Sequence, residues 1–150
     1  MNSIEETYQA THDHRIAVHS YLLRVMMILA KKAESHDLSK MESPEIEIFA
    51  EYTPKLKTCT YGSDEYNGYL KEMGVALQHH YENNRHHPEH FKNGIRGMNL
   101  MDLTEMLCDW MAATLRHDDG DILKSIEYNQ GRFNYSDELK QIFLNTVRDW

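Results

Sequence analysis

The chain contains very few residues that interrupt a helix. Its 150 residues include three prolines and seven glycines, and no stretch alternates apolar and polar residues in the way a half-buried strand does. Residues that cap helices recur along the chain and predict helix starts at Thr11, Ser43, Ser63, Asn99 or Asp102, Asp121 and Ser136. We therefore expect one all-α domain over residues 1–150, a compact bundle of about six helices.

The same signals predict where the helices end. The first is expected over residues 11–33, the third over 63–81, and the fourth as far as Arg116. Ser43 is followed by Pro44 and Glu45, which predicts a cap, a proline at the first helical position and an acid in the first turn. The stretches 34–42, 52–62 and 83–97 are expected to be irregular, and two of them contain histidines.

Charge and apolar content exclude several classes of protein. The formal net charge is -8, which argues against general nucleic-acid binding but allows a small anionic substrate held by a local cation. No run approaches the ~20 apolar residues that cross a membrane, and the N-terminus lacks the pattern of a secretion signal. Cys59 and Cys108 are expected to be reduced thiols in a cytoplasmic protein. The oligomeric state is left open, and a homo-oligomer is compatible with the sequence.

Histidine is unusually frequent, with ten residues. At 100° per residue, His14 falls inside the apolar arc of the first predicted helix, so we expect its side chain to point into the protein. His36 and Asp37 directly follow that helix. An imidazole and a carboxylate that reach the same point suit Mn, Fe, Co, Ni or Zn.

Five histidines lie between residues 79 and 90, which favours a metal or anion site over a plain polar loop. His80 continues the apolar face of the preceding helix and His79 does not, so His80 is predicted to face a pocket. Adjacent residues in an extended segment point to opposite sides. We therefore expect only one of His86 and His87 to face the site, and we predict His87, because Pro88 restricts its backbone.

An acidic stripe follows on the next predicted helix. Asp102, Glu105 and Asp109 share one side of it, opposite an apolar side formed by Leu103, Met106, Leu107 and Trp110. Periodicity alone predicts that such a stripe faces solvent.

The ordered set of His14, His36–Asp37 and Asp109 resembles the H…HD…D signature of the HD-domain phosphohydrolase superfamily. Lys40 matches the HD-x-x-K variant of that signature. The resemblance implies a compact helical core with a divalent ion (Mn, Fe, Co, Ni, Zn or Mg) ligated by His14, His36, Asp37 and Asp109. Some members bind a second metal ion through two further histidines.

The whole chain also resembles a small uncharacterised family that is common in phage genomes. The stretches that carry this second resemblance are HDLSKMESPE, TYGSDEYNGYL, HHYENNRHHPEHF and NLMDLTEMLCDWMAAT. It implies no activity.

The HD-domain resemblance implies a hydrolase that attacks a nucleotide or related phosphate ester with metal-activated water. Lys40 and Arg85 are then candidates to bind phosphate, and His80 and His87 to bind phosphate or protonate the leaving oxygen. Glu45 and Glu89 are candidates to orient ligands or water. A nucleobase could stack on tyrosines, and the candidates are Tyr61, Tyr66, Tyr69 and Tyr81.

Two alternatives remain open at this stage. Some HD-fold enzymes use the same ligands in a di-iron oxygenase. The chain could also be a non-catalytic phage protein that binds a nucleotide or a host factor, in the host cytoplasm.

Overall fold

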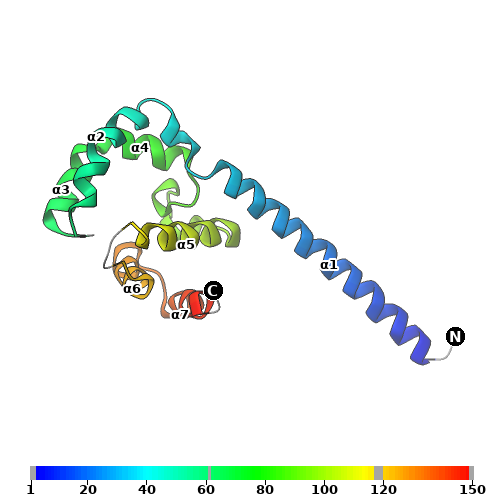
Figure 1. Cartoon of the computed structure of the whole chain (residues 1–150). Helices are drawn as coiled ribbons and strands as arrows, with labels where there is room; N and C mark the ends of the chain where they lie inside the picture. The colour runs from blue at the N-terminus through cyan, green and yellow to red at the C-terminus, as the bar shows by residue number, and fades with distance from the viewer. Residues whose placement is uncertain (1–2, 61, 117–119, 149–150) are drawn as a thin grey trace. The chain divides into compact units, whose positions relative to one another are not determined.

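The computed structural model describes residues 3–60, 62–116 and 120–148, and within these residues it contains helices and no strand (Figure 1). The all-α prediction is confirmed. Seven α-helices are described: α1 Ser3–Ser35, α2 Glu45–Lys57, α3 Asp64–Glu72, α4 Gly74–Asn83, α5 Leu100–Thr114, α6 Ile122–Phe133 and α7 Asp137–Arg148. Short 3-10 helices span Leu38–Met41, Pro88–His90 and Gly94–Gly97. The chain divides into two units, residues 1–35 and 36–150, and each is described by itself.

Helix α1 makes up the first unit. It begins at Ser3, about two turns earlier than predicted from a cap at Thr11. No side chain of α1 is buried; in its apolar arc Val18 and Leu22 are exposed, whereas Val25 and Leu29 are partly exposed. His14 is exposed on the same helix.

Three predictions about helix boundaries are wrong. Helix α2 begins at Glu45, after Pro44, and no side-chain cap precedes it. It also continues to Lys57, through part of the stretch expected to be irregular. The helix expected over 63–81 divides at Met73 into α3 and α4. Gly74 follows the break, and glycine weakens a helix because its backbone loses more freedom on folding than that of other residues.

The predicted caps at four other helices are confirmed, and one of them is Ser136, whose side chain accepts a hydrogen bond from the backbone N–H of Leu139 at the start of α7. The Ser63 side chain accepts a hydrogen bond from the backbone N–H of Tyr66 at the start of α3. Asn99 and Asp102 form a reciprocal capping box at α5. Asp121 accepts from the backbone N–H of Leu123 at α6. Each cap satisfies a backbone donor that would otherwise have no partner in the helix.

The apolar core of the second unit lies between α5, α6 and α7, which are drawn together in Figure 1. The rings of Trp110 and Phe143 meet edge to face at 5.9 Å. Tyr135 donates a hydrogen bond to the Ile126 carbonyl at 2.6 Å, which satisfies a buried hydroxyl. As predicted, Trp110 is buried in this core.

Side-chain hydrogen bonds hold the segment between α4 and α5 against both of these helices. His90 donates from Nδ1 to the carbonyl of Tyr81 on α4 at 2.8 Å. The Arg85 guanidinium donates to both carboxylate oxygens of Asp102 on α5, at 3.3 and 3.0 Å. The Asp102 side chain is fully buried, so this pair fixes the segment that contains His86 and His87 against the first turn of α5.

We expect Asp102→Ala to lower the free energy of unfolding by about 2–3 kcal/mol, because it removes half of a capping box and the acceptor for Arg85, whose half-exposed guanidinium is then solvated by water. The matched control is Asp121→Ala, which removes only a cap at α6 and should cost about 1 kcal/mol. Urea denaturation of both variants measures the difference. Equal losses would show that the Arg85–Asp102 pair adds nothing to stability.

Candidate metal centre

The candidate centre begins at a tight turn after α1. Asp37 has φ 56 and ψ 18, in the left-handed region that few residues other than glycine adopt. Aspartate tolerates this conformation better than most residues because its short polar side chain bonds locally. The turn leads into the 3-10 helix Leu38–Met41 and places the side chains of His36 and Asp37 next to each other.

A first group of ligand atoms joins this turn to α5. His36 Nε2 lies 3.5 Å from Asp37 Oδ2 and 3.6 Å from Asp109 Oδ1. Ligand atoms that share one ion at ~2.0–2.2 Å are separated by roughly 3.0–3.6 Å. The three residues that sequence analysis assigned to the metal in this unit are therefore at the spacing of a shared ion.

A second group joins the same aspartate to α4 and to the segment after it. Asp37 Oδ1 lies 3.3 Å from His80 Nε2 and 3.4 Å from His86 Nε2. His87 Nε2 lies 2.9 Å from His80 Nε2. The four residues could all reach one ion. Asp37 thus contributes a different oxygen to each group.

Two buried atoms of the second group have no hydrogen-bond partner among the described residues, namely Asp37 Oδ1 and His86 Nε2. Buried polar atoms are nearly always satisfied, so such atoms call for an explanation. A carboxylate oxygen and an imidazole lone pair that face each other at 3.4 Å repel unless positive charge lies between them. The residues present therefore fit a divalent cation at this position.

Two glutamates determine which ring nitrogen faces the centre. Glu105 Oε1 lies 3.0 Å from His36 Nδ1 and 3.3 Å from His86 Nδ1. Glu45, which is fully buried, lies 2.8 Å from His80 Nδ1. A carboxylate can only accept, so each Nδ1 carries a hydrogen, and each ring has a lone pair on Nε2 when its imidazole is neutral. This arrangement orients metal-binding histidines in many proteins.

The carboxylates around His36 favour positive charge at this point. Hydrogen bonding to Asp109 and Glu105 raises the pKa of the His36 imidazole to about 10, although burial opposes the shift. A cation in the first group would face the same carboxylates.

Asp37 and His87 have the ionisation states that metal ligands need. Burial raises the pKa of the Asp37 carboxyl, but contacts with the neighbouring imidazoles and the positive charge of the Lys40 ammonium outweigh it and hold that pKa well below its usual range. Burial, together with two neighbouring histidines, lowers the pKa of His87 to about 2. At neutral pH the carboxylate is ionised and the imidazole is neutral.

The other predicted phosphate-binding residues have partners of their own. Lys40 donates to Asp37 Oδ2 at 2.5 Å, and its ammonium group has two further hydrogens to offer a ligand. Arg85 binds Asp102 and stacks on the Phe91 ring at 4.8 Å, and it does not line the cleft described below. The structure therefore supports Lys40 at the centre and gives Arg85 a packing contact instead.

The predictions about the histidine cluster have mixed outcomes. His80 is 2 % exposed and belongs to the second group, as expected, whereas His79 is partly exposed and binds Glu45. The expectation that only one of His86 and His87 faces the site is wrong, because both belong to this group. The His87 N–H bonds back to the Asn84 carbonyl at 3.4 Å, so these residues form a turn rather than an extended segment.

The acidic stripe of α5 does not face solvent, contrary to its periodicity. Asp102 is fully buried, and the side chains of Glu105 and Asp109 are 12 % and 20 % exposed against the histidines. Sequence reasoning gave Glu105 no role. The signal was its spacing of one helical turn from Asp109, which placed both carboxylates beside His36. His14 belongs to the other unit, and its role as a ligand stays a prediction.

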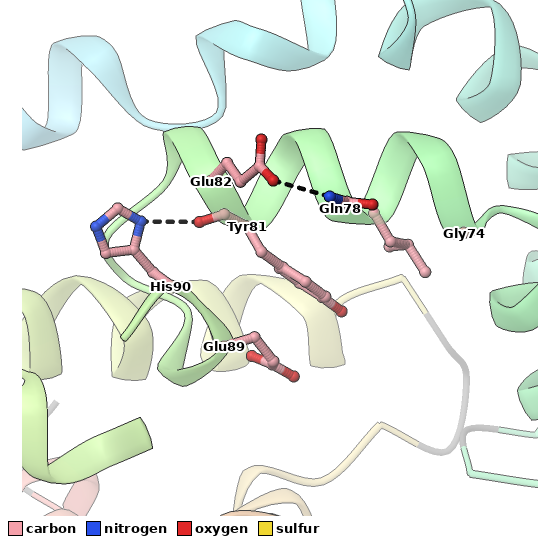
Figure 2. Close-up of a pocket in the computed structure, with 7 residues that line it drawn as sticks. Gly74, Gln78, Tyr81, Glu82, Glu89 and His90 are labelled. Carbon is pink, nitrogen blue, oxygen red and sulfur yellow. Dashed lines mark hydrogen bonds between the residues drawn. The ribbon is translucent and has the colours of Figure 1, made fainter. Parts of the chain in front are cut away.

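Two hollows border α4. The larger, a cleft of about 800 Å³, is lined by Lys40, His80, His87 and Asp109 and so opens on the centre. Figure 2 shows the smaller one, of about 350 Å³, where Gln78 donates to Glu82 and His90 to the Tyr81 carbonyl. Among the described residues that line it, the carboxylates Glu82 and Glu89 occur without a lysine or arginine, so it does not suit an anion.

Comparison with known proteins identifies a family. Residues 3–149 match the family described as a family of unknown function, DUF5662, and the chain belongs to it. The chain matches no curated protein and no solved structure at a significant level. The resemblances to the HD-domain superfamily and to a phage family stay predictions. Within the described residues, no helix is long and apolar enough to cross a membrane.

We expect Glu45→Gln to weaken Mn²⁺ or Zn²⁺ binding by about 10–100-fold. Glu45 accepts at Oε1 from His79 and at Oε2 from His80, so an amide would turn an N–H₂ group toward one of the two imidazole N–H groups. Calorimetric titration measures the affinity. Glu51→Gln, which alters an exposed carboxylate on the same helix, is the control. Unchanged affinity in Glu45→Gln would contradict an orienting role.

Proposed function

We propose that this protein is a metal-dependent phosphoric ester hydrolase that acts on a nucleotide or a related phosphate ester. The observation that supports the proposal is the convergence of Asp37, His80, His86 and His87 on one point, with two buried atoms unsatisfied, at the wall of a cleft. A divalent ion at such a centre lowers the pKa of a bound water and offsets charge on a phosphoryl group.

The residues at the centre have different roles in the proposed reaction. His36 and Asp109 hold one side of the centre, and His80, His86 and His87 the other, with Asp37 shared between them. His80 and His87, first considered as acid–base groups, are better placed as ligands. Lys40 borders the cleft and supplies a positive charge to a phosphate oxygen. Glu45 and Glu105 keep the rings in position.

A cytoplasmic location is part of the proposal. Cys59 and Cys108 are both free thiols, as they would be in a reducing compartment.

The first test is turnover. Purified protein loaded with Mn²⁺, Co²⁺, Ni²⁺ or Mg²⁺ is assayed for phosphate release from a panel of nucleotides and simple phosphate esters. We expect release that chelation abolishes and that Asp37→Asn reduces to background, because the amide has a neutral oxygen in place of the shared carboxylate. Asp64→Asn, at an exposed position in the first turn of α3, should retain full activity.

Other outcomes would favour the alternatives. Tight nucleotide binding without turnover in any metal would favour a binding protein, and oxygen consumption by an iron-loaded sample would favour an oxygenase. Either result would contradict the proposed hydrolase activity.

The second test is metal content. We expect about two ions per chain in the unaltered protein and about one in His87→Ala, because the second ligand group loses a member. His90→Ala, which removes a histidine of the same segment outside both groups, should keep the original content. Elemental analysis after dialysis measures both. Equal content in His87→Ala and the unaltered protein, with lower kcat or higher KM, would make His87 a phosphate or proton site instead.

A further inference from the structure

The cleft that opens on the centre has a second, chemically different part. Beyond the histidines, side chains from five helices line it with apolar and aromatic surface, and they include Phe49, Leu56, Leu70, Leu77, Trp110 and Phe133. Most of these are half-buried, so part of each is open to a ligand. A volume of about 800 Å³ is in the range of pockets that enclose small organic molecules.

Phe49 joins the two parts of the cleft. Its ring meets the His80 imidazole edge to face at 6.0 Å, and the Lys40 ammonium lies 5.4 Å from its centroid. The apolar wall and the charged groups of the centre therefore lie about one aromatic ring apart, so a single ligand can contact both.

The charge of the cleft differs from that of the chain. Within the described residues, Asp109 is the carboxylate that lines it, against Lys40, Lys57, Arg116 and Arg132. Lys40 is paired with Asp37 at 2.5 Å, and Arg132 is paired with Glu89 at 2.6 Å. The chain as a whole has a net charge of -8. The cleft therefore favours a ligand with an anionic group, whereas most of the surface does not.

Hydrogen-bonding groups are scarce on the apolar wall. Apart from the charged residues and histidines, the side chains that could hydrogen-bond there are Thr53, Tyr66, Tyr81 and the indole of Trp110. A site built to read the edges of one base or the hydroxyls of a sugar would need several fixed donors and acceptors.

We propose that this wall binds the organic group of the substrate, and that the substrate class is phosphate esters of large aromatic or apolar alcohols rather than of small polyols. The inference rests on the proposed hydrolase function, because it assigns the phosphoryl group to the centre. Burial of the organic group against the wall supplies binding energy in proportion to its apolar area.

The proposal has a consequence for selectivity. Apolar pockets distinguish poorly between ligands of similar size, whereas sites that hydrogen-bond a ligand reject analogues strongly. Purine nucleotides, pyrimidine nucleotides and aryl phosphates should therefore be accepted with similar efficiency. Glycerol phosphate, which offers hydroxyls and little apolar surface, should be a poor substrate.

The experiment compares 1-naphthyl phosphate with glycerol phosphate on the full, metal-loaded chain. Leu70→Asp places a charge on the apolar wall and should raise KM for the naphthyl ester at least about tenfold with little change in kcat, since it removes binding to the organic group alone. Values for glycerol phosphate should stay the same. Leu123→Asp, an exposed leucine on α6 outside the cleft, is the matched control and should behave as the unaltered protein. Leu70→Ala, a milder change, should show a smaller shift in the same direction if Leu70→Asp fails to fold.

A binding measurement separates this inference from the hydrolase itself. Calorimetry compares naphthylmethylphosphonate with methylphosphonate, neither of which can be hydrolysed as an ester. Tighter binding of the aryl compound, by about tenfold or more and lost in Leu70→Asp, would support the cleft even if no ester were turned over. Hydrolysis of both esters with equal KM, and equal binding of both phosphonates, would overturn the cleft assignment and leave the hydrolase standing.

Discussion

The candidate centre depends on hydrogen bonds from imidazole Nδ1 atoms to two glutamates. Glu105 faces Nδ1 of His36 and His86, and Glu45 faces Nδ1 of His80. Because each carboxylate can only accept, each ring keeps a hydrogen on Nδ1, and in its neutral form it turns the Nε2 lone pair toward Asp37 or Asp109. Without these contacts the rings could adopt either tautomer, and the ligand atoms would not converge. The helices and the turn at Asp37 bring the rings near one another, and the glutamates determine what they can bind.

The sequence predicts those features of the fold that are determined by residues close together in the chain. The caps at Ser63, Asn99 and Asp121 satisfy backbone donors within three residues, so their sequence patterns located the starts of α3, α5 and α6 correctly. The break at Met73 lacks such a pattern, since the apolar face continues through it from α3 into α4. Nothing at Thr11 could show that α1 extends back to Ser3, because the preceding residues are also compatible with a helix.

For the candidate site, too, some residues could be predicted from the sequence and others could not. His36, Asp37 and Asp109 were predicted from the resemblance to the H…HD…D signature and His80 from its helical phase, and the structure brings all four into the ligand groups. Glu105 was missed because periodicity separates apolar from polar faces and cannot show that a polar face is buried against other polar residues. His86 was missed because its segment was taken as extended, whereas a turn places neighbouring side chains on the same side.

The same carboxylates impose an order on ligand binding under the proposed function. Asp37, Asp109 and Glu105 face the centre, in a chain whose net charge is already -8. A phosphate ester would meet these charges directly if it arrived before a metal ion, and Lys40 is already paired with Asp37. A bound divalent ion is commonly the largest charge in its surroundings and reverses the local preference from cation to anion. Metal and substrate should therefore bind in that order, with the apolar wall contributing to affinity only once the phosphoryl group has a positive partner.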